Sequence, residues 1–123
     1  MSDHKKLDVA EISSYQGPGA IPGIKFRQAA KDLNVTAWGM NVLEIDAGCT
    51  AYPEHDHASD GQEEVYVVLS GSGVLSVGSD ETALKTGSLA RVGPAAKRKI
   101  IPGPQGITIL ALGATPGKAY QPR

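Results

Sequence analysis

The stretch PEHDHASDGQEEVYVVLSG, residues 53–71, has a polar first half and a valine-rich second half. His55 and His57 are two residues apart, and on a strand such side chains project from the same face. Glu64 opens the apolar half after a polar loop that can return the chain antiparallel. An antiparallel neighbour could place its carboxylate opposite the two imidazoles. The residues alone leave two interpretations open: a His-His-Glu metal cluster, or a polar loop that faces water.

The sequence from residue 35 onward has the pattern of several short β-strands. The apolar runs are rich in β-branched residues and are bounded by turn signals such as GSG, GSD, KTG and PGP. They are VTAWGMNVLEI, EEVYVVLS, GVLSV, TALKT, LARV, RKII and ITILAL. No helical pattern separates them, which is typical of an antiparallel sandwich or barrel. The one helix-like stretch is KFRQAAKDL, residues 25–33, so the sequence predicts an all-β fold with one short helix.

Length and composition predict a single domain. Residues 1–23 are polar and end in GPGAIPG, which indicates an irregular N-terminal arm, and residues 24–123 form the domain proper. The 12 basic and 13 acidic residues nearly balance, so a nucleic-acid partner is not expected. No apolar run approaches the ~20 residues that span a membrane. The single Cys49 cannot form an internal disulfide, and we expect a cytoplasmic protein.

The histidine stretch resembles the first motif of the cupin superfamily, G-x5-H-x-H-x3-4-E-x6-G. The matching residues are Gly48, His55, His57, Glu64 and Gly71. Two spacings depart from the motif, with six residues before the first histidine and six before the glutamate. The longer loop leaves Gln62 and Glu63 as fallback ligands. The resemblance covers about residues 36–113 and implies a small, jelly-roll-like antiparallel β-barrel, with its site inside one mouth and commonly a homodimer.

The second cupin motif, G-x5-P-x-G-x2-H-x3-N, is degenerate in GSLARVGPAAKRK, residues 87–99. Arg98 or Lys99 stands where the family usually has a fourth ligand, a histidine. The third histidine of the chain, His4, lies in the polar arm. Arginine has no lone pair to give a metal. Three alternatives follow for Arg98: it binds an anionic substrate beside a three-ligand metal, it pairs with Glu64 in a metal-free pocket, or it faces solvent.

Several other side chains are candidates for the same pocket. Tyr66 shares the alternation phase of Glu64 and offers a hydroxyl. Trp38 and Met40 form either a pocket wall or plain core, and Cys49 is interpreted as a packing residue. The acids Glu54, Asp56 and Asp60 either orient the imidazoles as hydrogen-bond acceptors or face water.

The resemblance implies a metal-binding small cupin. It would hold one divalent transition metal (Fe, Zn, Ni, Cu or Mn) through His55, His57 and Glu64, with Arg98 and Tyr66 as catalytic residues. The expected activity is that of a dioxygenase, isomerase or lyase on a small organic molecule, including an anionic one. The alternative is a non-catalytic module that binds a small ligand or acts as a sensor, with or without metal.

Overall fold

The computed structural model describes residues 3–122 of the 123-residue chain, so residues 1–2 of the predicted arm and Arg123 lie outside the described part. Within it the chain forms strands, one short helix and one 3-10 turn. They are η1 (Val9–Glu11), β1 (Ile24–Arg27), α1 (Ala29–Leu33), β2 (Gly39–Ile45), β3 (Glu63–Val77), β4 (Asp80–Lys85), β5 (Leu89–Val92) and β6 (Arg98–Ala114). The predicted all-β class is confirmed.

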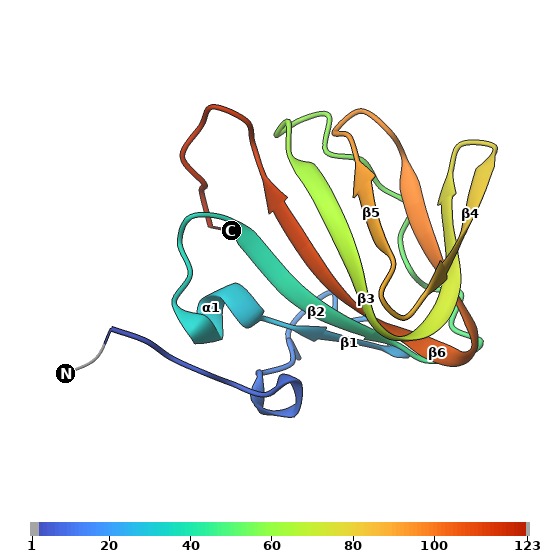
Figure 1. The fold of residues 1–123 in the computed structure, drawn as a ribbon, viewed down its shortest axis with the longest axis horizontal. Helices are drawn as coiled ribbons and strands as arrows, with labels where there is room; N and C mark the ends of the chain where they lie inside the picture. The colour runs from blue at the N-terminus through green and yellow to red at the C-terminus, as the bar shows by residue number, and fades with distance from the viewer. Residues whose placement is uncertain (1–2, 123) are drawn as a thin grey trace.

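One antiparallel sheet, folded on itself, makes the barrel (Figure 1). Its strand order is β1-β2-β6-β3-β4, and β5 pairs with the free edge of β3. The long strands β3 and β6 pair from Glu63 with Ala114 to Val77 with Arg98. Both strands bend halfway along, so β2 and β5 lie in one half of the folded sheet and β4 lies in the other. The bend therefore brings the first residues of β3 and of β6 to facing halves of the barrel.

Glycines make the bend in the two long strands. The register between β3 and β6 shifts on both sides of Ser70 and Gly71, where the pairing has a bulge. Gly71 has a φ of +79°, and a Cβ there would overlap the carbonyl oxygen of Gly106. The predicted turns at GSG and PGP are therefore wrong, because both strands run on through these residues. A bulge and a turn favour the same residue types, so the local sequence does not separate them.

The main core fills the space between the two halves of the sheet. Its buried residues come from β2, β3, β4, β5 and β6: Leu43, Ile45, Tyr66, Val68, Leu75, Leu84, Val92, Ile100, Ile107, Ile109 and Ala111. These positions alternate along the strands with residues on the outer face, as the period of a half-buried strand requires.

A second, smaller core covers part of the outer face. Ile12 packs there against Ala29 of α1 and Val42 of β2, and the Arg27 Nη1 donates to the Ile12 carbonyl at 2.8 Å. The helix predicted over residues 25–33 is confirmed only in its second half, because residues 24–27 pair with β2 as an edge strand. The arm boundary at residue 23 stays a prediction, but the residues around Ile12 are packed onto the barrel.

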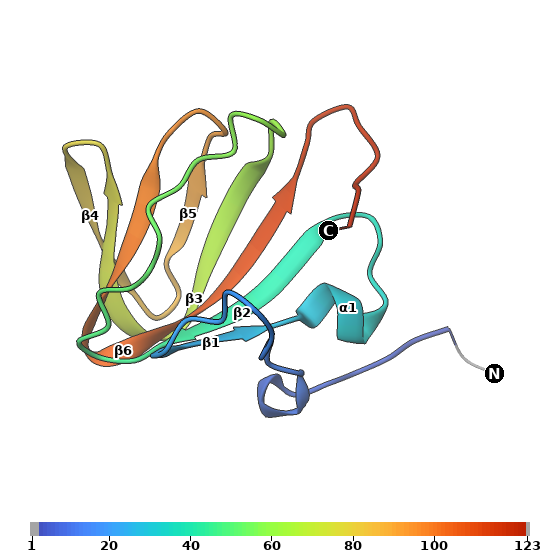
Figure 2. The same ribbon diagram turned by 180° about the vertical axis from the view of Figure 1, so that it is seen from behind.

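Residues 46–62, here called the crossing segment, connect β2 to β3 and pass over the open side of the folded sheet (Figure 2). Backbone hydrogen bonds hold it there. His55 and Arg98 exchange two of them, at 3.1 and 2.9 Å, and the His57 N–H donates to the Pro94 carbonyl at 2.8 Å. Both histidines are thus fixed to the start of β6 and the loop before it. None of the helices in residues 3–122 is long and apolar enough to cross a membrane.

Candidate metal centre

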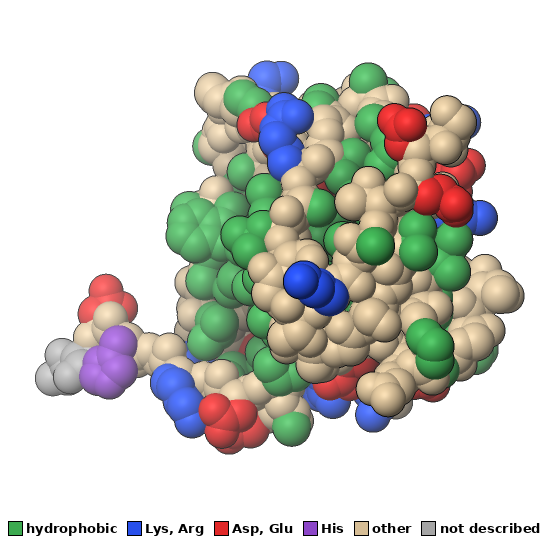
Figure 3. Space-filling model, turned by 45° about the vertical axis from the view of Figure 1, so that its right-hand side comes forward, with side chains coloured by type: hydrophobic (Ala, Val, Ile, Leu, Met, Phe, Trp, Pro, Cys, Tyr) green, Lys and Arg blue, Asp and Glu red, His purple; other side chains and the backbone are tan. Residues whose placement is uncertain are grey.

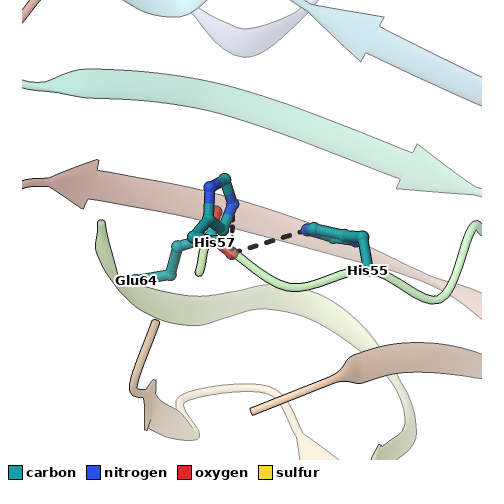
Figure 4. A group of neighbouring side chains, drawn as sticks. All are labelled: His55, His57 and Glu64. Atoms are coloured by element: carbon teal, nitrogen blue, oxygen red, sulfur yellow. Dashed lines mark ion pairs between the residues drawn. The ribbon is translucent and has the colours of Figure 1, made fainter. Parts of the chain in front are cut away.

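His55, His57 and Glu64 converge on one point inside the barrel (Figure 4). The Nε2 of His57 lies 3.3 Å from Oε1 of Glu64, and the Nε2 of His55 lies 3.7 Å from the same oxygen. One nitrogen or oxygen atom of each residue lies within 4.8 Å of the others. The crossing segment supplies the imidazoles and the start of β3 supplies the carboxylate. The motif resemblance in the sequence implied this grouping.

The second nitrogen of each imidazole is held by an acceptor. The Nδ1 of His55 lies 3.0 Å from the Pro53 carbonyl oxygen, and the Nδ1 of His57 lies 3.1 Å from Oδ1 of Asp60. A carbonyl and a carboxylate accept hydrogen bonds, so each neutral ring carries its proton on Nδ1 and its lone pair on Nε2. Asp60 thus has the orienting role considered for it in the sequence.

The donor set fits a divalent transition metal. Two Nε2 lone pairs and a carboxylate oxygen point at one another, and they repel unless a cation or a proton lies between them. Two imidazoles and one carboxylate are a ligand set used for iron and for other first-row metals. The fallback ligand Glu63 is not in the group, because it lies on the outer face and pairs with Arg91. The other fallback ligand, Gln62, has its amide oxygen close to Gly113 of β6.

Arg98 is buried directly beside this His-His-Glu group. Its side chain is 0% exposed, and its Nε lies 3.8 Å from Oε1 of Glu64. The Nη2 donates to the Gly93 carbonyl at 2.8 Å, whereas Nε and Nη1 have no acceptor among the described residues. The interpretation of Arg98 as a solvent-facing charge is therefore wrong. Lysines flank it in the sequence, but alternation along β6 turns its side chain inward.

Tyr66 donates its hydroxyl proton to Oε1 of Glu64 at 2.7 Å. Tyr52, which was not among the residues predicted from the sequence, has its hydroxyl hydrogen-bonded to that of Tyr66. Burial raises the pKa of Tyr52 to about 12 and raises the pKa of Tyr66 as well, so both keep their protons at neutral pH. No spacing in the sequence marks Tyr52, since only the path of the crossing segment brings it here.

The site keeps Glu64 ionised. Burial alone would raise the pKa of its carboxyl, but the hydrogen bonds from His55 and Tyr66 and the charges of His57 and Arg98 lower it overall. The same contact acts on the imidazole, because Glu64 raises the pKa of His55 against the opposing effect of burial. A proton can therefore take the position between His55 and Glu64 that a metal ion would take.

The remaining candidates lie away from this centre. Trp38 is 44% exposed on the outer face, and Met40 packs against the outer core. Cys49 is free and packs against the main core, in line with its interpretation as a packing residue. His4 is exposed and belongs to no ligand group within residues 3–122.

The fold is that of cupin proteins. The structure is similar to a cupin protein from Bacteroides fragilis, with a TM-score of 0.72 and 22% identity over 100% of this chain and 93% of that one. It is similar to a sugar phosphate isomerase of the cupin superfamily from Silicibacter pomeroyi, with a TM-score of 0.73 and 18% identity over 89% and 75% of the two chains. It is also similar to the Cnp3 cupin domain of Schizosaccharomyces pombe, with a TM-score of 0.71 and 17% identity over 89% and 73%. No protein-family model and no curated protein matches the sequence.

Proposed function

We propose that this chain is a metal-binding small cupin that holds one divalent transition metal (Fe, Zn, Ni, Cu or Mn) through His55, His57 and Glu64. The main support is that two Nε2 lone pairs and a carboxylate oxygen converge. Both Nδ1 atoms are already hydrogen-bonded to acceptor oxygens. Three protein ligands leave positions of an octahedral ion open for a small molecule. The proposed activity is a reaction on a small organic substrate at those positions, of the isomerase, lyase or dioxygenase type.

Among these reactions, isomerisation of an anionic substrate has the most support. The Silicibacter pomeroyi protein of the same fold is described as a sugar phosphate isomerase, and a sugar phosphate is an anion. A bound divalent metal supplies Lewis-acid polarisation of a substrate oxygen. Arg98 adds a buried positive charge that attracts an anion to the mouth. Tyr66 fixes the orientation of Glu64 through its hydrogen bond.

The activity is tested with metal-loaded protein and a panel of small sugar phosphates in D2O. Nuclear magnetic resonance follows the exchange of the carbon-bound proton next to the carbonyl. Exchange in the wild type and its loss in His57→Ala support an isomerase. A loaded protein that exchanges no proton in any member of the panel contradicts the isomerase assignment.

A non-catalytic binding or sensor module is the second candidate. The burial of Arg98 favours it, since a guanidinium that is 0% exposed cannot contact a dissolved substrate as the barrel stands. The role of Arg98 as a direct substrate anchor therefore requires the site to open. Saturable binding of a sugar phosphate without proton exchange is the result that distinguishes this candidate.

We propose further that the chain forms a homodimer through the outer face of the sheet. Apolar side chains gather on this face (Figure 3), where Leu89 is 71% exposed and Val65 pairs in register with Leu112. Trp38 borders the same surface. An apolar face with charges of both signs at its rim suits a two-fold interface. The free Cys49 suits a reducing compartment, so a cytoplasmic location is part of the proposal.

A further inference from the structure

We infer that Arg98 competes with the metal ion for Glu64 and so keeps the metal affinity of the centre low. The inference rests on the metal centre proposed above. It gives Arg98 a role that needs no contact with substrate, in agreement with the burial of its side chain. Arg98 is then a positioning residue that acts on the metal through Glu64.

The backbone fixes Arg98 next to a metal ligand. His55 and Arg98 are partners in an antiparallel bridge, and each donates its N–H to the carbonyl of the other. Side chains of such a pair project from the same face and start about 5 Å apart. The guanidinium therefore shares the face of the His55 imidazole, and the bridge fixes the positions from which both side chains start.

The guanidinium has no complete set of acceptors. One of its nitrogens bonds the Gly93 carbonyl, and Nε and Nη1 have no acceptor among residues 3–122. A buried cation without an acceptor or counter-ion is costly. Oε1 of Glu64 lies 3.8 Å from Nε, just beyond hydrogen-bonding distance. The oxygen that faces both histidines is thus also the one that would pair with Arg98.

With a divalent ion in this centre, the positive charges would outnumber the single negative charge of Glu64. The ion brings two positive charges next to the one on Arg98, and Glu64 is the carboxylate they share. Arginine stays protonated and cannot become a ligand, so the repulsion is not relieved by losing a proton. At the effective dielectric constant of a protein interior, a unit charge a few ångströms away changes affinity by at least about tenfold. Replacement of Arg98 by a neutral side chain should therefore tighten metal binding.

Isothermal titration calorimetry of the metal-free protein with Co2+ tests this inference. Arg98→Met removes the charge and keeps an unbranched side chain of similar length, and we expect its dissociation constant to fall at least about tenfold below that of the wild type. Arg98→Lys keeps the charge and should bind with the wild-type affinity. Arg91→Met removes a surface arginine from the outer face and should also leave the affinity unchanged. A gain in affinity cannot result from general damage to the fold.

Equal or weaker Co2+ binding by Arg98→Met would overturn the role of Arg98 and leave the metal centre standing. Absence of binding in both proteins, with circular dichroism showing both folded, would overturn the metal centre as well. If Arg98→Met does not fold, Arg98→Gln gives the same comparison, because it is neutral and keeps an N–H donor for the Gly93 carbonyl. The unfolding temperature with and without Co2+ is a second readout and should rise more in the neutral variant.

Discussion

His55 and Arg98 form an antiparallel bridge in which the Arg98 N–H donates to the His55 carbonyl at 2.9 Å and the His55 N–H donates back at 3.1 Å. This pair closes the barrel, because it joins the crossing segment to the start of β6. The same pair puts an imidazole and a guanidinium on one face, close to Glu64. Barrel closure and the composition of the site therefore depend on one backbone contact.

The bend of the long strands should depend on Gly71. Gly71→Ala places a Cβ against the backbone of Gly106 at a φ of +79°. We expect it to lower the free energy of unfolding by about 3 kcal/mol or more. This loss combines the cost of placing alanine in the left-handed region with the cost of the overlap with Gly106. Chemical denaturation measures the change.

The matched control for the bend is Gly48→Ala. Gly48 has a φ of +77°, but apart from its two chain neighbours no described residue has an atom within 4 Å of the position of a Cβ. This variant carries the backbone cost alone, about 1–2 kcal/mol. Equal losses in the two variants would show that the contact with Gly106 does not shape the bend.

The hydroxyl of Tyr66 should contribute to stability through Glu64. Tyr66→Phe removes the donor to Oε1 and the hydrogen-bond partner of the Tyr52 hydroxyl, and it should cost about 1–2 kcal/mol of unfolding free energy. Tyr15→Phe is the control, because the Tyr15 hydroxyl bonds the Pro18 carbonyl at the surface and its loss should cost less. If Tyr66→Phe is as stable as Tyr15→Phe, the Tyr66 hydroxyl does not stabilise the protein through Glu64.

Metal affinity should rise with pH. Glu64 raises the pKa of His55 above its ordinary 6.5, and a protonated imidazole cannot bind a metal. Protons therefore compete below the pKa of His55, so affinity increases as pH passes upward through it and then levels off. The pKa of Glu64 is lowered below 4.5, so this group does not titrate in that range. Co2+ titrations between about pH 6 and 8 should show the rise, and a flat profile would contradict it.

The outer face should hold a dimer together. Trp38 is 44% exposed on this apolar surface, and Trp38→Glu places a charge there. We expect the variant to be a monomer in analytical ultracentrifugation, because a buried charge disfavours the dimer interface. Lys25→Glu changes charge at an exposed position of the edge strand β1 and should keep the dimer. A monomeric wild type would refute the proposed interface.

Much of the fold follows from the local alternation of apolar and polar residues, but the closure of the barrel does not. Alternation along residues 63–71 predicts that Glu64 and Tyr66 share a face, and they do. The Gly-rich breaks at residues 70–73 and 102–106 are bends inside strands, a distinction that depends on pairing between distant segments. The helix predicted over residues 25–33 begins only at Ala29 for a similar reason, since pairing with β2 outweighs the weak helical preference of its first residues.

The grouping of His55, His57 and Glu64 was predictable from the sequence, and so was the place of Tyr66 beside Glu64, but the position of Tyr52 was not. Histidines two apart with a glutamate at the start of the next strand are a local signal. Tyr52 carries no such signal, because it reaches Tyr66 only through the path of the crossing segment. Arg98 stands between two lysines in a polar stretch, so the sequence left three positions open for it: at a substrate, paired with Glu64, or at the surface. Its burial comes from the bridge with His55, and that pairing is not encoded in the sequence near either residue.

Metal stoichiometry tests the central claim most directly. Protein stripped of metal, reloaded with one divalent ion at a time and desalted is analysed by inductively coupled plasma mass spectrometry. The account predicts about one transition-metal ion per chain in the wild type. It also predicts the loss of that ion in His55→Ala, His57→Ala and Glu64→Gln, while Glu63→Gln on the outer face retains it. A wild type that binds no metal under any loading condition, or a His57→Ala variant that binds as well as the wild type, would contradict it.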